Sequence, residues 1–189
     1  YILCVGRLAD ARKNVELLFR AYHRVRTRLP DPPRLVLAGR SAPGEQAWQV
    51  ADGLGIRDWI DYVASPSDSQ LVELYQGARL LALSSDEEGL GLVVLEAMAC
   101  GLPVVSTRCG GPEETVVDGE TGLLTPMGQE GPLANGIVHL LSDEVLSETM
   151  GKAGRARAEI HYSSRRNGDE LLGVYRTLLR KQPRSHAAR

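Results

Sequence analysis

The chain of 189 residues is 43% hydrophobic, which is enough for one domain with a full core. Its 22 Lys and Arg against 24 Asp and Glu give a formal net charge of −2, which offers no overall attraction to nucleic acid. No apolar run approaches the roughly 18 residues that a membrane span needs, and no secretory signal opens the chain. We therefore expect a cytoplasmic protein with no nucleic-acid partner and no transmembrane segment.

Basic residues gather at the start of the chain, where residues 1–40 contain nine basic and three acidic side chains. These cations either form a solvated face or bind an anionic ligand. The chain opens at Tyr1 within an apolar run and without an initiator Met, which indicates a fragment of a longer protein. Its three cysteines, Cys4, Cys100 and Cys109, fit a reducing compartment better than a disulfide framework.

Six short apolar runs have the length and composition of strands that are buried on both faces. They are Tyr1–Val5, Arg34–Ala38, Ile60–Val63, Arg79–Leu83, Pro103–Ser106 and Gly122–Thr125. Between some of them, apolar residues recur at spacings of three and four, which indicates helices. Asn14 can cap the helix that follows the first strand, and Ser67 or Asp68 can cap the helix that precedes the fourth.

After the sixth strand the alternation stops, and helical patterns cover residues 132–141, 143–158 and 165–181. Alternating strands and helices predict an α/β fold: a Rossmann-like parallel sheet of about six strands, with helices on both faces and extra helices at the C-terminus. We assign residues 1–182 to this domain and residues 183–189 to a polar tail. Ligands of such sheets bind at the carboxyl ends of the strands.

The end of the first strand is one place to look for chemistry. Gly6 allows a tight turn there, and Arg7 and Lys13 can converge in front of the sheet. A guanidinium fork and a mobile ammonium together suit a phosphate or a diphosphate. On its own, a basic loop of this kind is more often a solvated turn.

The end of the fourth strand is the second place. An acidic loop containing Glu88 leads through Gly89 and Gly91 to the start of a helix, whose free N–H groups favour an anion. Glu88 and Glu96 are eight residues apart and can border one cleft, where carboxylates can accept hydrogen bonds from sugar hydroxyls. The alternative is that both are structural acids, one of them favoured by the helix dipole.

These residues resemble the C-terminal half of the retaining GT-B glycosyltransferases, in the "glycosyl transferases group 1" family (glycosyltransferase family four). The similarity covers nearly the whole chain in order, and its specific part is a Glu-x7-Glu segment followed by Ala-Met-Ala-x-Gly-x-Pro-Val. The motifs that carry it are Gly6-Arg7, Lys13-Asn14, the segment from Glu88 to Val105, Gly110-Gly111-Pro112-Glu113, Asp118-Gly119 and Gly122-Leu123-Leu124.

The resemblance implies a nucleotide-diphosphate sugar donor, a UDP-, GDP- or ADP-sugar, held between two Rossmann-like domains. It implies that Arg7 and Lys13 bind the diphosphate and that Glu88 binds the transferred sugar. Glu96 would bind the ribose, and the backbone near Ser65 would lie against the base. The remaining donor contacts implied are Gly6, Gly89, Leu90, Gly91 and Leu92.

By the same resemblance the catalytic residues are Arg7, Lys13 and Glu88, and no metal or other cofactor is expected. Fixed cations stabilise the charge that develops on the leaving diphosphate, which is the role that a divalent metal has elsewhere. The family's N-terminal domain, which carries acceptor contacts, is absent from this chain. We expect the isolated fragment to be inactive and leave open a peripheral membrane contact through the missing domain.

Four positions depart from the family pattern: Ser84, Ala64, Leu90 and Ser164 stand where proline, glycine, phenylalanine and tryptophan are common. None of these departures removes a charged donor-binding residue. The alternative hypothesis is a non-catalytic, nucleotide-binding module that keeps the fold and serves in assembly or regulation. The chain lacks the glycine patterns of nicotinamide-binding and phosphate-loop proteins, the Gly-x-Ser-x-Gly of hydrolases and any His/Cys metal spacing.

Overall fold

The computed structural model describes residues 1–181, and the predicted tail at 183–189 lies outside the described residues. Within them the chain forms a six-stranded sheet of order β3-β2-β1-β4-β5-β6, in which every neighbouring pair is parallel. The strands are β1 (Ile2–Arg7), β2 (Leu35–Ser41), β3 (Ile60–Ala64), β4 (Leu80–Leu83), β5 (Val104–Thr107) and β6 (Leu123–Thr125). The predicted Rossmann-like parallel sheet is confirmed.

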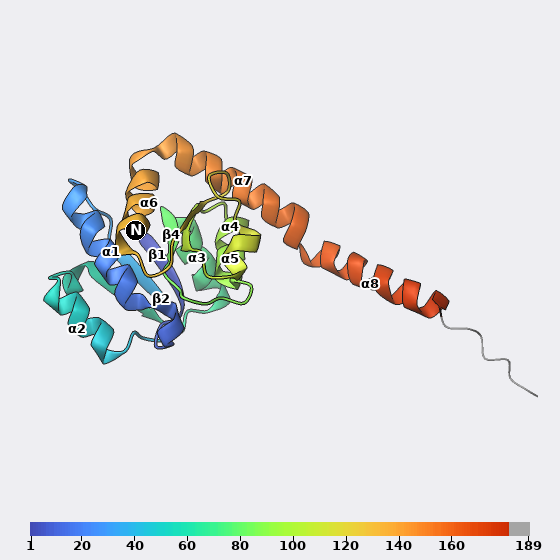
Figure 1. Cartoon of the computed structure of the whole chain (residues 1–189), viewed down its shortest axis with the longest axis horizontal. Helices are drawn as coiled ribbons and strands as arrows, with labels where there is room; N and C mark the ends of the chain where they lie inside the picture. Colours follow the sequence, from blue (N-terminus) through green and yellow to red (C-terminus); the bar gives the residue numbers. More distant parts are fainter. Residues whose placement is uncertain (182–189) are drawn as a thin grey trace, which may run out of the picture.

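Helices cover both faces of the sheet, as predicted (Figure 1). They are α1 (Val15–Arg28), α2 (Glu45–Gly53), α3 (Asp68–Gly77), α4 (Leu92–Ala99), α5 (Gly111–Thr115), α6 (Glu130–Ser142), α7 (Glu144–Tyr162) and α8 (Ser164–Lys181). The three helices expected after the last strand are present, each slightly longer than predicted. Helices α2 and α5 were not predicted: no side-chain cap bond marks the start of α2, and α5 has only five residues.

Alternation along the strands divides the core into two layers. In β1, Ile2 and Cys4 face the layer built with α1, α2 and α6. Leu3 and Val5 face the layer built with α3, α4 and α7. Because both faces of the strands are covered, β1 reads as a continuous apolar run, and all four of these side chains are buried.

Helix starts are set by the side chains that the sequence indicated. Asn14 Oδ1 accepts a hydrogen bond from the N–H of Leu17 and caps α1. Ser67 caps α3 in a capping box, in which its hydroxyl and the Gln70 side chain satisfy each other's backbone N–H groups. Because α1 follows β1 and α3 follows β3 in a parallel sheet, both helices begin at the carboxyl edge of the sheet.

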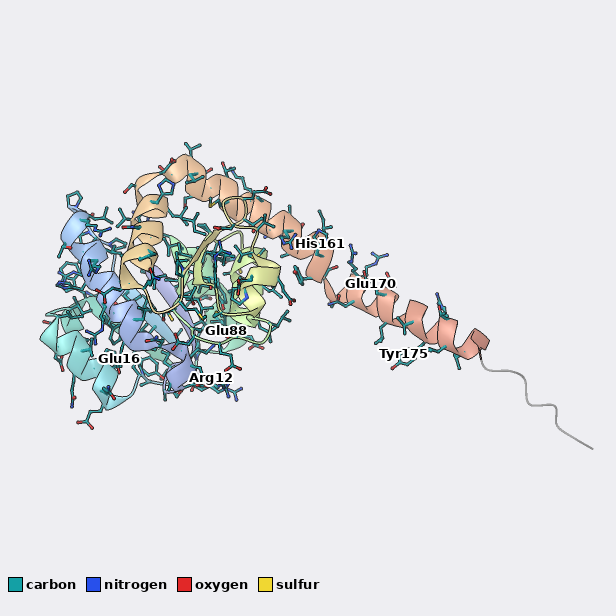
Figure 2. The ribbon with its side chains drawn as sticks, in the orientation of Figure 1. Arg12, Glu16, Glu88, His161, Glu170 and Tyr175 are labelled. Carbon is teal, nitrogen blue, oxygen red and sulfur yellow. The ribbon has the colours of Figure 1, made fainter. Side chains whose placement is uncertain are left out.

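Helix α8 projects away from the rest of the molecule (Figure 1). Six of its apolar side chains are between 50% and 70% exposed: Leu171, Leu172, Val174, Tyr175, Leu178 and Leu179. Figure 2 shows Glu170 and Tyr175 on this projecting part. Across residues 1–181, no helix combines the length and the apolar character that crossing a bilayer requires.

Strands β1 and β2 lie in close backbone contact at Gly39, near the carboxyl ends of the sheet. A Cβ atom at this position would fall on the carbonyl oxygen of Gly6, which is a backbone atom that cannot swing away. Gly39 therefore keeps β1 and β2 in contact at the point where β1 leaves the sheet.

We expect Gly39→Ala to lower the free energy of unfolding by about 1–3 kcal/mol, because the added methyl group must push two hydrogen-bonded strands apart. The measurement is urea unfolding followed by circular dichroism. Gly53→Ala is the matched control, since a Cβ there meets nothing within 4 Å. The control should leave stability unchanged or raise it by up to about 1 kcal/mol. Equal behaviour of the two variants would contradict the close contact.

Candidate functional site

A cleft of about 780 Å³ lies at the carboxyl ends of the strands, a size typical of ligand sites. It spans the ends of β1 and β2, the loops after β3 and β4, and the starts of α3 and α4. In this strand order the chain reverses direction across the sheet between β1 and β4, and ligands of open α/β sheets bind at such a switch point.

Nine of the ten predicted site residues line this one cleft: Gly6, Arg7, Lys13, Ser65, Glu88, Leu90, Gly91, Leu92 and Glu96. Gly89 does not. The backbone of Glu88 pairs with the next loop, through Glu88 N–H to Cys109 O (2.7 Å) and Gly111 N–H to Glu88 O (2.9 Å), and Gly89 is exposed beyond this pairing. The two loops that the sequence singled out, after β1 and after β4, thus line the same cleft.

Lys13 and Glu88 form an ion pair inside the cleft. Lys13 Nζ lies 2.5 Å from Glu88 Oε1, and each side chain is only 13% exposed. The buried Ser85 hydroxyl donates a second hydrogen bond to the same oxygen, at 2.7 Å. Glu88 Oε1 thus accepts two hydrogen bonds, whereas Glu88 Oε2 forms none within residues 1–181. Figure 2 shows Glu88 on the main body of the protein, away from the projecting helix α8.

Further contacts join the loop after β1 to the loop after β4. The N–H of Asp86 donates to Arg12 O at 2.7 Å. Ser84 Oγ donates to Lys13 O (2.9 Å) or Asn14 O (3.0 Å), and the Asn14 amide donates to the Asp86 carboxylate. These bonds fix the backbone on both sides of the ion pair, so its position does not depend on the charges alone.

Arg7 stands at the mouth of the cleft, with 71% of its side chain exposed. Its guanidinium lies 3.4 Å from Asp10, which is also bound by Arg12. Hydrogen bonds from Arg12 lower the pKa of Asp10 to about 2, so this carboxylate stays ionised near neutral pH. Arg7 and Lys13 thus border the same cleft, but the Lys13 side chain is mostly buried and the Arg7 side chain is mostly exposed.

The start of α4 brings backbone donors to the cleft. Gly91 is its N-cap residue and has a φ of 71°, a left-handed conformation that favours glycine. The first N–H groups of a helix have no partner within it and carry the positive end of its dipole. The first turn of α4 contains no acidic residue, so these donors face the cleft without a built-in counter-charge.

Glu96 lies one turn into α4, and the Tyr75 hydroxyl of α3 donates a 2.7 Å hydrogen bond to its Oε2. Tyr75 is 2% exposed. Burial, together with the bond to Glu96, raises the pKa of Tyr75 above its usual range, so the hydroxyl keeps its proton and remains a donor. The bond orients Glu96 with its other oxygen available.

The part of the cleft beside β2 and β3 is built by residues that sequence reasoning mostly missed. Ser65 has a φ of 47°, and its N–H donates to Gly39 O at 2.8 Å. Arg40 at the end of β2 and Asp68 at the start of α3 line the same part. The rule that ligands bind at strand ends could have indicated Gly39 and Arg40, had it been applied to the second strand.

Two other observations concern reactive groups. Burial raises the pKa of the Cys4 thiol, below the ion pair, to about 12, so it stays protonated. Across the described residues 1–181, no three His, Cys, Asp or Glu side chains come together as a metal site would require.

Comparisons with known proteins agree on one family. The family model described as "Glycosyl transferases group 1" matches residues 1–157. A GDP-mannose-dependent alpha-(1-6)-phosphatidylinositol monomannoside mannosyltransferase of Mycolicibacterium smegmatis is 33% identical over 177 residues, which are 90% of this chain and 46% of that protein. The chain thus spans less than half of the length of this curated relative.

Solved structures agree on the fold. Sucrose-phosphate synthase from Thermosynechococcus elongatus has a TM-score of 0.84 and 31% identity, and the match covers 96% of this chain and 46% of that chain. The Anabaena protein HepE, solved in complex with UDP, has a TM-score of 0.83 and 26% identity, covering 94% of this chain and 49% of that one. In both cases this chain corresponds to about half of the solved chain, as predicted for one half of a GT-B fold.

The geometry of the ion pair gives a direct test. In a double-mutant cycle of Lys13→Met and Glu88→Gln, we expect a coupling free energy of about 1–3 kcal/mol, because both groups are mostly buried and share further hydrogen bonds. Chemical denaturation of the four proteins measures it. The exposed pair Lys152–Glu148 on α7, at 2.9 Å, is the control and should show coupling near the experimental error. Coupling no larger than in the control would show that the pair does not join the loops.

Proposed function

Because this chain belongs to the glycosyl transferases group 1 family, we propose that it is the donor-binding half of a retaining glycosyltransferase. The observation that carries the proposal is the shared cleft: Lys13, Glu88 and the start of α4 all line it. A cation, a carboxylate and open helix N–H groups are the chemistry that a sugar diphosphate needs.

The diphosphate would bind between the carboxyl ends of β1 and β4. An ammonium has three N–H donors, and Glu88 takes one from Lys13, so the others remain for phosphate oxygens. Arg7 is exposed at the mouth and can bind the second phosphate with its planar fork. The N–H groups of Leu92 and Val93 at the start of α4 complete the site.

The two carboxylates would bind the two sugars of the donor. Glu88 is fixed through Oε1 and presents Oε2, which suits a hydroxyl pair of the transferred sugar. Glu96 is fixed through Oε2 by Tyr75 and presents Oε1 to the ribose hydroxyls. The base would then lie near the backbone of Ser65. Nucleotides of this class include GDP-mannose, named for the M. smegmatis relative, and UDP, the nucleotide part of a UDP-sugar, bound in the Anabaena structure.

In the transfer, the bond between the anomeric carbon and the phosphate oxygen breaks, and the acceptor oxygen forms a bond to that carbon on the same face. The electron pair of the broken bond stays on the diphosphate, and the acceptor proton passes to the departing phosphate oxygen. Arg7, Lys13 and the α4 N–H groups stabilise the negative charge that develops there, so no metal ion is required.

The acceptor site would belong to the other half of the parent protein. The relative from M. smegmatis is about twice as long as the matched segment, which is 46% of its length. The exposed apolar face of α8 is a surface on which a second half can pack, since such a face is otherwise costly in water. Without that half, this chain would bind donor but not complete a transfer.

Calorimetric titration of the chain with UDP, GDP and ADP tests the donor site. At least one should bind with millimolar or better affinity, and Lys13→Ala should abolish this binding. Glu96→Gln should weaken the nucleoside diphosphate by roughly 10- to 100-fold, because a charge-assisted acceptor for the ribose is lost. Glu88→Gln should weaken only the corresponding sugar nucleotide.

The control for this titration is Lys152→Ala, which removes an exposed lysine of α7 outside the cleft and should bind as the unmodified chain does. If the nucleotides bind but sugar nucleotides bind no differently, and the parent transfers no sugar, the chain is the non-catalytic module of the alternative hypothesis. If Glu88→Gln affects the bare nucleotide and Glu96→Gln affects only the sugar nucleotide, the two roles are reversed.

Chelation tests the role given to the cations. In the full-length parent, excess EDTA should leave turnover unchanged, while Lys13→Ala should lower it by at least about 100-fold, the usual effect of losing one group that stabilises developing negative charge. The measurement is release of the nucleoside diphosphate with time. A strict requirement for Mg²⁺ would show that Arg7 and Lys13 do not suffice.

A further inference from the structure

The cleft continues from the proposed phosphate site toward β2 and β3. Glu96 and Tyr75 mark the boundary, and α3 leads from there to the outer rim: Tyr75, Leu71 and Asp68 are spaced by four and three residues, so they lie along one face of the helix. Leu71 and Asp68 both line the cleft. A nucleotide with its ribose at Glu96 would therefore place its base between the start of α3 and the end of β2.

Arg40 stands across this space from α3. Val36 and Ala38 of the same strand face the layer that contains α3 and α4. The register between β1 and β2 shifts between Ala38 and Ser41, so Arg40 lies in the irregular end of β2, and it lines the cleft. The base position is thus bordered by a guanidinium from β2 and a carboxylate from α3.

Neither of these two charges is neutralised by the protein. Arg40 and Asp68 are exposed, and within residues 1–181 neither side chain forms an ion pair or hydrogen bond, with each other or with any other side chain. Other charged side chains of the fold do form ion pairs: Arg34 pairs with Asp61, and Arg12 pairs with Asp10. The rim therefore offers one free donor fork and one free acceptor pair.

We infer that Arg40 and Asp68 select guanine, so that the donor of this site is a GDP-sugar; the inference rests on the proposed function. Guanine presents two adjacent acceptors, O6 and N7, which match a guanidinium fork. On the neighbouring edge it presents N1–H and the N2 amino group, two adjacent donors that match a carboxylate. Pro66 and Leu71, which also line the cleft, offer apolar contact to the ring faces.

The other common bases do not match this pair of charges. Adenine places its amino donor beside N7, where the guanidinium would meet another donor. Uracil has a single N–H between two carbonyl oxygens, so a carboxylate that accepts from it also meets an oxygen. With adenine or uracil, polar groups of the base or of the two side chains would be left unpaired or would face a like charge, which lowers affinity.

Isothermal titration of the chain with GDP, UDP and ADP measures the selectivity. We expect GDP to bind about 10- to 100-fold more tightly than UDP or ADP, the discrimination typical of bidentate contacts to a base. Arg40→Ala and Asp68→Ala should each reduce this ratio. Arg20→Ala on α1 and Glu73→Ala on α3 remove exposed charges outside the cleft and should leave it unchanged.

Two modified nucleotides separate the two contacts. 7-Deaza-GDP lacks the N7 acceptor and should bind about 3- to 10-fold more weakly than GDP, except in Arg40→Ala, where the two should bind equally. Inosine diphosphate lacks the N2 amino group and should show the same loss, except in Asp68→Ala. Circular dichroism of each variant shows that it is folded.

The outcomes distinguish this inference from the proposed function. If UDP or ADP binds as tightly as GDP, or if the variants do not change the losses caused by the modified bases, the guanine assignment is overturned. The donor site still stands in that case, provided that Lys13→Ala abolishes binding. If no nucleoside diphosphate binds at all, the proposed function and the assignment of guanine are both overturned.

Discussion

The ion pair between Lys13 and Glu88 is the contact on which the site depends, because it joins residues that are 75 positions apart in the sequence. Strand order makes the contact possible: β1 and β4 are neighbours, so the loops that leave them emerge side by side. The Ser84, Asn14 and Asp86 hydrogen bonds then hold both backbones. A charged pair with little exposure persists only when its surroundings satisfy it in this way. The fold thus supplies the geometry, and the charges supply the chemistry.

The cleft also shows why overall charge says little about this ligand. Arg7, Lys13 and Arg40 line it together with Glu88, Glu96 and Asp68, so cations and carboxylates are balanced at the site as they are in the whole chain. What differs is their order in space. In the proposed arrangement, cations face phosphates or the acceptor atoms of the base, and carboxylates face hydroxyls or base N–H groups. A site for a molecule with both anionic and donor groups need not carry net charge.

Much of this architecture could be predicted from the sequence, because the strands are continuous apolar runs and the first helices carry side-chain caps at Asn14 and Ser67. Helix α2 was missed because only Ala47 and Ala51 of it are buried and its N-cap, Gly44, has no side chain. These are weak signals beside the long apolar face of α1.

Some charged residues of the site could be identified from the sequence, and others could not. Arg7, Lys13, Glu88 and Glu96 could be found because they stand in loops rich in glycine and charge or in a distinctive motif. Arg40 belongs to no motif, and only its place at the end of the second strand could have indicated it. The contacts of Tyr75 with Glu96 and of Ser85 with Glu88 arise only from packing.

The projecting helix α8 has a practical consequence for the solubility of the isolated chain, because its exposed apolar side chains can associate between molecules. Sulfate strengthens such association, so the chain will salt out readily in sulfate. Cooling weakens it, so the chain will dissolve better in the cold.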